Sequence, residues 1–487
     1  MSLSIHNTVK DCPATVLRPT ADTPPPYDGE QNDPSPGPGL STTRLFFAHV
    51  GAALTLFLAT VDAHIVSTSL PTIASDLNAS TMQYTWVGVA YLLTQTALQP
   101  LYGRISDLVG RKTVLYASIA IFAVGSALCG AAKTAKWLIA ARALAGVGGG
   151  GIVSAVWVIT SDIVEVQNRA KWSQALSITW SCSAVAGPLL GGLFSGHQGT
   201  GILSWRWGFY INLPICAAAV AIITLSLRKV TISKDPDASL CRFFARFDFG
   251  GLVLFVGGSA CIVVGFGLAS ETGWKSPSTL VGLVLGAILL VLAGFYECYT
   301  ERDCLFPPSM FRNPAAVIIL VLSYLHYFSF SAGTFYLALY YQAANGSTPY
   351  EAGIKMLPYS LGSSLASMPA AWFITMWQAR KGDTKGVNAV ISLGLFLATV
   401  GFGLLNLLHA NSSLSAQALF PLLAGVGVGM LFHAPYQVFT KAVKPSELAT
   451  GTSAFFLVRF TGSTTGIAVA GAIFSARSSK DFLQTCR

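Results

Sequence analysis

Long apolar runs separated by short polar segments fill the chain from about residue 45 onward. Each run is about 20 residues long, the length of α-helix that crosses a hydrocarbon core of about 30 Å at 1.5 Å per residue. Because irregular backbone cannot face lipid, each run is expected to form a helix. The pattern therefore predicts an all-α polytopic membrane protein. The thirteen predicted helices lie near residues 46–70, 83–102, 113–132, 137–160, 172–195, 207–227, 250–270, 279–299, 314–341, 353–376, 387–408, 415–437 and 450–474.

The composition agrees with the lipid bilayer as the solvent for most of the chain. Of the 487 residues, 53% are hydrophobic and 10% are charged, whereas a soluble domain has about 25% charged residues. Lys and Arg in cytoplasmic loops explain the net charge of +9, so no nucleic-acid partner is expected. The 9 cysteines are scattered without a CxxC pair, and no acid–base or nucleophile constellation is visible. We therefore expect no metal, no cofactor and no enzymatic activity.

The charges of the loops predict the orientation. If the N-terminus is cytoplasmic, the loops on its side exceed the opposite loops in Lys and Arg by roughly four to one. The N-x-[ST] sequons at Asn78, Asn345 and Asn411 all fall in the opposite loops, where glycosylation would occur, although sequons also arise by chance. We expect a plasma-membrane protein, with the vacuolar membrane as the alternative.

Residues 1–44 are rich in Pro, Asp, Ser and Thr. Such a segment cannot bury enough apolar surface to become ordered, so we expect a disordered cytoplasmic tail. Within it, Pro24, Pro25, Pro26 and Tyr27 form a PPxY element, which can dock in the WW domain of a ubiquitin ligase. A chance occurrence in a Pro-rich segment is the alternative.

The chain contains an internal repeat with a constant offset of 279 residues. "LAGVGGG" at 144–150 matches "LAGVGVG" at 423–429, and Gly187 matches Gly466. Two six-helix halves related by an axis along the membrane normal would produce this repeat.

The repeat divides the chain into segments. It predicts an N-terminal half at 45–228, a cytoplasmic linker at 229–249, an inserted helix pair at 250–300 and a C-terminal half at 301–487. At the same offset, the partner of the helix at 207–227 would fall near 486–506. The last helix of the second half is therefore expected to be missing from this sequence.

The segment "GRISDLVGRK" at 103–112 resembles the loop signature of the major facilitator superfamily. Its glycines permit a tight turn, and Asp107 can accept charge-assisted bonds from Arg111 and from a helix N-terminus. The resemblance implies the major facilitator fold and a conformational latch, whereas a solvated charge run is the alternative. The latch residues would be Gly103, Arg104, Asp107, Gly110, Arg111 and Lys112.

The segment "GPLLGG" at 187–192 resembles the antiporter motif of the same superfamily. Gly187, Gly191 and Gly192 would allow close helix approach, and Pro188 would bend the helix. Ser183 stands where the family has its first glycine. An ordinary kinked helix is the alternative, and the association with export comes from the family alone.

The segment "VDAHIVSTSLPTI" at 61–73 resembles the helix-one motif of the fourteen-helix drug:proton antiporters. A carboxylate at a helix centre costs about 2.5–3.5 kcal/mol on insertion scales, so Asp62 is expected to face a cavity and to carry a proton, or else to make a structural hydrogen bond. His64 stands where that family has Thr, and we favour a packing role for it. "RALAGVGGGG" at 142–151 resembles the helix-four motif, which would place Arg142 near Asp62. Arg459 is a second intramembrane cation that matches the family, and with Asp62 and Arg142 it completes the expected proton-coupling group.

Together these segments resemble fungal multidrug exporters and vacuolar basic-amino-acid transporters. The resemblance implies a proton-coupled secondary active transporter that exports a small organic molecule such as a drug, toxin or secondary metabolite. Its partners would be the bilayer, the cargo and protons. The two halves would alternate access to a cavity lined by helices one, two, four, five and their repeats. Vacuolar uptake of basic amino acids and a non-transporting nutrient sensor are the alternatives.

Overall fold

The structure is a computed structural model that describes residues 41–164, 169–195, 204–228, 247–300, 302, 305–306, 308–409, 412–444 and 448–485. The PPxY residues Pro24, Pro25 and Tyr27, the sequon Asn411 and most of the predicted linker lie outside these residues. Over the described residues the regular elements are α-helices. The first of them begins at Thr42, three residues inside the segment expected to be a disordered tail.

A helix or a broken pair of helices lies at each of the thirteen predicted positions. The first half contains α1 (Thr42–Asp76), α2 (Thr81–Val109), α3 (Arg111–Gly130), α4 (Ala135–Ile163), α5 (Arg169–Ser195), α6 (Trp207–Tyr210) and α7 (Asn212–Leu227). The predicted inserted pair corresponds to α9 (Phe249–Thr272) and α10 (Pro277–Tyr299). The remaining helices are α11 (Pro308–Arg312), α12 (Pro314–Ala343), α13 (Pro349–Lys355), α14 (Leu357–Lys381), α15 (Lys385–Leu405), α16 (Leu414–Met430), α17 (Ala434–Ala442) and α18 (Leu448–Thr485).

Two helices are less apolar than expected. Eleven segments of the described chain are long and apolar enough to cross a membrane, and α2 and α14 are not among them. Both helices contain several Ser, Thr or Gln residues within their apolar runs. They are nevertheless 29 and 25 residues long, which is enough to span the hydrocarbon core. Both are therefore helices where the sequence predicted them, with spans more polar than the other eleven.

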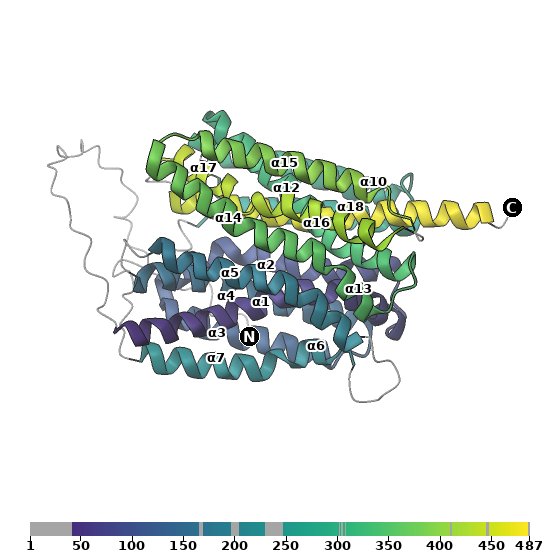
Figure 1. Cartoon of the computed structure of the whole chain (residues 1–487), viewed down its shortest axis with the longest axis horizontal. Coiled ribbons are helices and arrows are strands. Elements are labelled where there is room, and N and C mark those ends of the chain that lie inside the picture. Colours follow the sequence, from purple (N-terminus) through teal and green to yellow (C-terminus); the bar gives the residue numbers. More distant parts are fainter. Residues whose placement is uncertain are drawn as a thin grey trace, which may run out of the picture.

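The two halves pack their helices in the same way. α1 packs on α5, and α4 packs on both α2 and α3; at the repeat offset, α12 packs on α18, and α16 packs on both α14 and α15. Figure 1 shows the two sets as two layers, with the first half below and the second half above.

The glycines of the repeated "LAGVG" segments explain this packing. A β-carbon on Gly148 would lie 2.7 Å from the Phe122 Cα of α3, and one on the equivalent Gly427 would lie 2.6 Å from the Ala398 Cα of α15. Only glycine permits backbones to approach so closely, because it has no side chain. The repeat read in the sequence is therefore a repeat of helix contacts.

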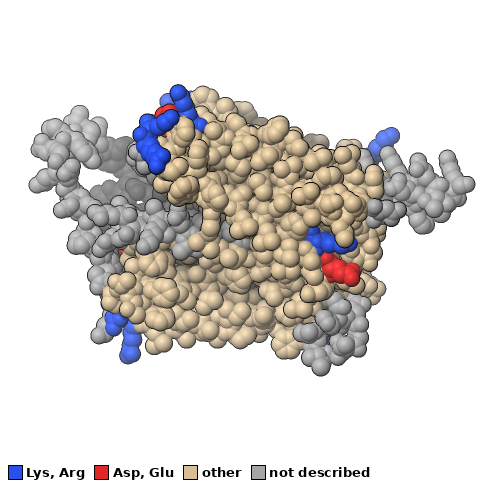
Figure 2. All heavy atoms as spheres, in the orientation of Figure 1, with Lys and Arg blue, Asp and Glu red and all other residues tan. Residues whose placement is uncertain are grey.

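The charged side chains avoid the middle of the molecule. On the face shown in Figure 2, Lys, Arg, Asp and Glu lie at the two ends of the helices, and a broad band between them has no charge among the described residues. Large apolar side chains such as Leu285, Val291 and Phe295 on α10 are exposed. A helix that exposes such residues is stable only against lipid, since water would disfavour so large an apolar surface.

Candidate functional site

Asp62 lies near the middle of α1 and takes part in a fully buried ion pair. Its Oδ2 accepts from the Nη1 of Arg142 on α4, and both side chains have an exposed fraction of 0%. Its Oδ1 accepts from the amide of Asn212, the first residue of α7, at 3.2 Å. The carboxylate therefore has partners on two other helices. The structure thus brings Asp62 and Arg142 together, as the resemblance implied.

The cluster extends to two more helices, α2 through Arg142 and α3 through Asn212. The Nε of Arg142 donates to the backbone carbonyl of Val87 at 3.2 Å, and the central carbon of its guanidinium lies 4.4 Å from the centre of the Tyr91 ring, both on α2. Asn212 donates to the Ser126 hydroxyl of α3 at 3.1 Å. The Nη2 of Arg142 is buried and has no hydrogen-bond partner in the described structure. A change in the charge of Asp62 would therefore disturb contacts among α1, α2, α3, α4 and α7.

Sequence reasoning missed Asn212 and Tyr91 as members of the cluster. Asn212 lies in the stretch "WRWGFYINLP" at 205–214, which overlaps the start of the helix predicted at 207–227. A buried amide inside an apolar run needs hydrogen-bond partners, so it could have been recognised as a candidate. The Tyr91 hydroxyl donates to the backbone carbonyl of Ala59 on α1 at 2.7 Å, and no local pattern indicates that contact.

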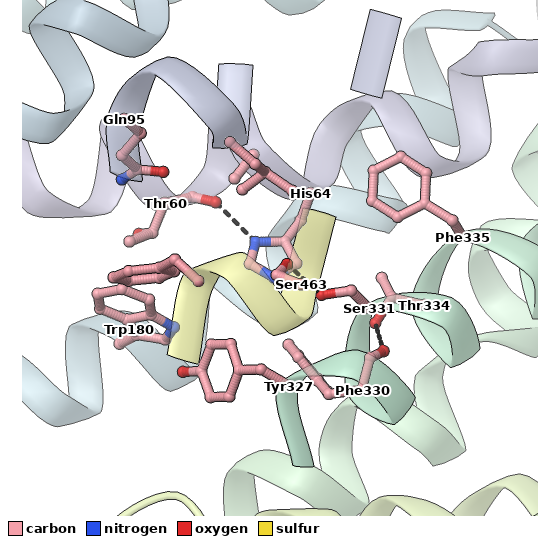
Figure 3. A pocket seen from close by; sticks show the side chains of 13 residues that line it. Thr60, His64, Gln95, Trp180, Tyr327, Phe330, Ser331, Thr334, Phe335 and Ser463 are labelled. Carbon is pink, nitrogen blue, oxygen red and sulfur yellow. Dashed lines mark hydrogen bonds between the residues drawn. The ribbon is translucent and has the colours of Figure 1, made fainter. Parts of the chain in front are cut away.

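A small cavity lies between the two halves, on the other side of α1 from the ion pair. Thr60, Ala63 and His64 of α1 line it, but Asp62 does not (Figure 3). The space open to the centre of a water molecule is about 30 Å³, room for one or two waters. A cargo molecule would need the two halves to separate. The other lining residues are Leu92, Gln95, Trp180, Tyr327, Phe330, Ser331, Thr334, Phe335, Phe460 and Ser463.

The helices that line the cavity agree only in part with the expectation. α1, α2 and α5 line it from the first half, and α12 and α18, the repeats of α1 and α5, line it from the second. α4, α14 and α16 provide no lining residue. α4 lies behind α1 and α2, where it supplies Arg142 to the ion pair.

His64 is part of the cavity wall, whereas the sequence favoured a packing role. Its Nδ1 lies 2.7 Å from the backbone carbonyl of Thr60, to which it can donate within the helix. Its ring lies 5.9 Å from that of Phe330 on α12, and its Cβ packs against Gly187 of α5. The side chain therefore packs and also faces the space between the halves.

The residues that resemble the antiporter motif join α1 to α5. The Thr68 hydroxyl donates to the Pro188 carbonyl at 2.8 Å, and the Ser69 hydroxyl donates to the Gly191 carbonyl at 3.0 Å. Both contacts are hydrogen bonds from side chains of α1 to backbone carbonyls of α5. Gly187 lies so close to α1 that a β-carbon there would be 2.6 Å from the Cβ of His64.

The same motif also touches the second half. A β-carbon on Gly192 would lie 2.5 Å from the Pro349 carbonyl of α13, and one on Gly353 would lie 2.9 Å from the Pro188 carbonyl. The Gln342 amide of α12 donates to the Thr68 carbonyl at 3.1 Å. α5 therefore meets α13, and α1 meets α12, at the end of the molecule where α1 ends, which is the right-hand end in Figure 1.

The residues that resemble the latch lie where α2 meets α3, at the opposite end; those before Gly110 are the last turns of α2 and those after it are the start of α3. Gly110 has a φ of 97°, a left-handed conformation that favours glycine. Arg111 donates to the Asp162 carboxylate of α4 at 3.2 Å, and the Lys112 amine donates to the Leu227 carbonyl at 2.6 Å. The side chains of Gly103, Arg104 and Asp107 lie outside the described part of the structure. Asp162 is an additional acidic partner that the motif alone did not indicate.

Arg459 on α18 does not join the ion pair with which the sequence grouped it. Its Nη2 donates to the Phe432 carbonyl at 3.1 Å, and its central carbon lies 4.0 Å from the centre of the Tyr327 ring. All its described contacts are with the second half.

The two described sequons differ in their surroundings. Asn78 is exposed between α1 and α2, with a φ of 48°. The Asn345 amide donates to Gln417 at 3.2 Å and its side-chain oxygen is buried. Glycosylation stays a prediction, and Asn78 is the more accessible site.

An all-helical chain with lipid-facing bands, two similarly packed halves and a cavity between them is a polytopic membrane transporter. The sequence profile of the Major Facilitator Superfamily matches residues 52–467, and the chain belongs to this family. It is 34% identical over 438 residues to an uncharacterized transporter of this type from Schizosaccharomyces pombe, covering 89% of this chain and 71% of the relative. It is also 32% identical over 454 residues to the efflux pump FUS6 of Gibberella fujikuroi (93% and 79% covered) and to the efflux pump dotC of Dothistroma septosporum (93% and 74% covered).

Solved structures share the fold at low sequence identity. An auto-inhibited peptide transporter of the POT family matches with a TM-score of 0.63 and 15% identity, covering 91% of each chain. A bacterial homologue of the lysosomal transporter Spinster, inward-facing and unoccupied, matches with a TM-score of 0.58 and 15% identity, covering 88% of this chain and 82% of that one. These likenesses concern the fold.

Proposed function

We propose that this transporter exports small organic molecules in exchange for protons, with Asp62 as the proton carrier. The observation that carries the proposal is the fully buried Asp62–Arg142 pair, separated by α1 from a cavity between the halves. An ionised carboxylate is stable there only while Arg142 and Asn212 compensate for the lost water. Protonation of Asp62 would remove the negative charge that balances Arg142 and would favour a different arrangement of α1 against α4.

The direction of transport is inferred from two further observations. The curated relatives at 32% identity include proteins named efflux pumps, and the contacts of α5 with α1 are made by residues that resemble the antiporter motif. One proton moving through about 100 mV and one pH unit releases about 3.7 kcal/mol, enough for a cargo gradient of a few hundredfold. We place the N-terminus in the cytoplasm and the protein in the plasma membrane. The PPxY element would bind the WW domain of a ubiquitin ligase.

The proposal is tested first by finding a cargo and then by driving its transport. Metabolites are compared inside and outside cells with and without the gene, and one that the gene moves to the medium is chosen. In vesicles reconstituted with the full chain, this compound should accumulate several-fold or more when the interior is acidic. A protonophore should abolish the accumulation. Accumulation that persists in the presence of the protonophore would exclude proton coupling. If cells with and without the gene hold and release the same metabolites, export would be excluded.

The Arg111–Asp162 ion pair gives a prediction for the proposed latch. Both side chains are partly exposed, at 22% and 31%, so the pair is worth about 0.2–1 kcal/mol. Asp162→Asn should therefore change the cargo exchange rate by only about two- to fivefold without loss of insertion. Asp383→Asn is the matched control, because Asp383 accepts from the Trp377 indole rather than from a cation. Equal rates for both variants would argue against a latch at this pair.

A further inference from the structure

Arg459 is a buried cation, and no described carboxylate lies beside it to balance its charge. Its exposed fraction is 7%, and its guanidinium lies among the rings of Tyr327, Phe432, Phe455 and Phe456, at 4.0 to 5.9 Å from the ring centres. Cation–π contacts of this kind offset part of the cost of removing a cation from water. They do not neutralise its charge.

Among the acidic side chains of the second half that the structure describes, none pairs with Arg459. The sequence from 301 to 487 contains six acidic residues, Glu301, Asp303, Glu351, Asp383, Glu447 and Asp481. Glu351 caps α13 by accepting from the Thr348 amide at 2.9 Å, and Asp383 accepts from the Trp377 indole at 2.6 Å. The side chains of Glu301, Asp303, Glu447 and Asp481 lie outside the described part of the structure.

Among the described residues, neither the first half nor the neighbouring titratable groups place a negative charge beside Arg459. Asp62, the acid in the middle of α1, is already held by Arg142. The titratable side chains whose fields reach Arg459 are Tyr327, His326 and His433, which are neutral or cationic near neutral pH. Buried charges in membranes are usually paired and functional, so the partner of Arg459 is expected to come from outside the chain.

A single side chain, that of Tyr327, separates Arg459 from the cavity between the halves. Tyr327, whose ring lies under the guanidinium, lines the cavity together with Phe460, the residue after Arg459. The rings of Phe460 and Trp180 are stacked at 6.1 Å. Figure 3 places Trp180 and Tyr327 at one end of the cavity and Phe335 at the other. The end of the cavity next to Arg459 is therefore aromatic.

We propose that Arg459 binds the negatively charged group of an aromatic cargo, either a carboxylate or a phenolate. This inference rests on the proposed transport function and names its substrate class. The cargo's ring packs on the aromatic wall, and Tyr327 turns aside so that the anion reaches the guanidinium. An Arg–carboxylate pair is strong because both partners are charged and the guanidinium can donate two parallel hydrogen bonds.

The experiment measures equilibrium binding to the full chain in lipid nanodiscs, with 2-naphthoate and its uncharged analogue 2-naphthamide as probes. Wild type should bind the acid about tenfold to a hundredfold more tightly than the amide, because a hydrogen bond to a charged group adds about 1.5–3 kcal/mol of binding free energy. Arg459→Gln should bind both probes equally and weakly, and Arg459→Lys should retain part of the preference. Arg380→Gln, which removes an exposed cation at the end of α14, should behave as wild type.

Equal affinity of wild type for the two probes, or no binding of the acid, would overturn the proposal. So would an Arg459→Gln variant that still prefers the acid. Thermal unfolding of each variant identifies a folding defect, and if Arg459→Gln does not fold, the two-probe comparison on wild type and Arg459→Lys decides. Because no pH gradient is present, these outcomes are independent of the proton coupling. A wild type that prefers the acid while vesicles show no proton-driven transport would separate the two proposals.

Discussion

Asp62→Asn should abolish the accumulation of cargo against its gradient while cargo binding persists. Asparagine keeps the shape and the hydrogen-bonding capacity of aspartate but cannot ionise, so it cannot carry a proton. A gradient of a few hundredfold in wild type should fall to equality inside and outside the vesicles. The measurement is uptake into vesicles with an imposed pH difference, alongside equilibrium binding and downhill exchange of the same cargo.

Two further variants make this result interpretable. Asp76→Asn makes the same chemical change on the same helix, but Asp76 is at the end of α1 and pairs with Arg206 at 3.0 Å, so it should leave accumulation intact. Asp62→Asn also leaves the buried Arg142 without a counter-charge, which can destabilise a protein by about 3–5 kcal/mol. The double variant Asp62→Asn, Arg142→Gln removes that charge and should restore folding without restoring accumulation. Accumulation by either folded Asp62 variant with the wild-type pH dependence would make Asp62 structural.

Gly192→Leu should reduce transport about fivefold or more by preventing the two halves from meeting at one end. A β-carbon at Gly192 would already lie 2.5 Å from the Pro349 carbonyl, and a leucine side chain would force α5 and α13 apart. Overpacking of this kind costs about 1–3 kcal/mol, which shifts a two-state equilibrium by about five- to more than a hundredfold. The conformation closed at this end should therefore become rare, and the cycle should slow.

Spin labels at Leu193 of α5 and Tyr350 of α13, both exposed, report the separation of the halves. In Gly192→Leu their mean distance should increase relative to wild type. Gly294→Leu on α10 is the control, because nothing lies within 4 Å of a β-carbon there. Unchanged label distances together with a wild-type transport rate would show that this contact does not gate the cycle.

The sequence predicted the helices well because the bilayer imposes a local rule. A helix satisfies its backbone within about 20 consecutive residues, so a long apolar run is sufficient to locate it. The helices α2 and α14 departed from the apolar pattern, since they carry more polar residues along their length. The internal repeat also predicted two similarly packed halves, because the glycines that set the helix contacts recur at the same offset.

The sequence by itself determined the all-helical membrane fold, the internal repeat and the family. Only the tertiary structure decided which side chains meet, because those meetings join positions far apart in the chain. Asp62 reaches Arg142 across 80 residues and Asn212 across 150, and no local pattern encodes the second contact. The grouping of Arg459 with Asp62 followed from the shared rarity of intramembrane charges, but helix packing placed it among aromatic rings of the other half. Where a membrane helix lies is a matter of local hydrophobicity, whereas what its polar residues bind depends on how distant helices pack.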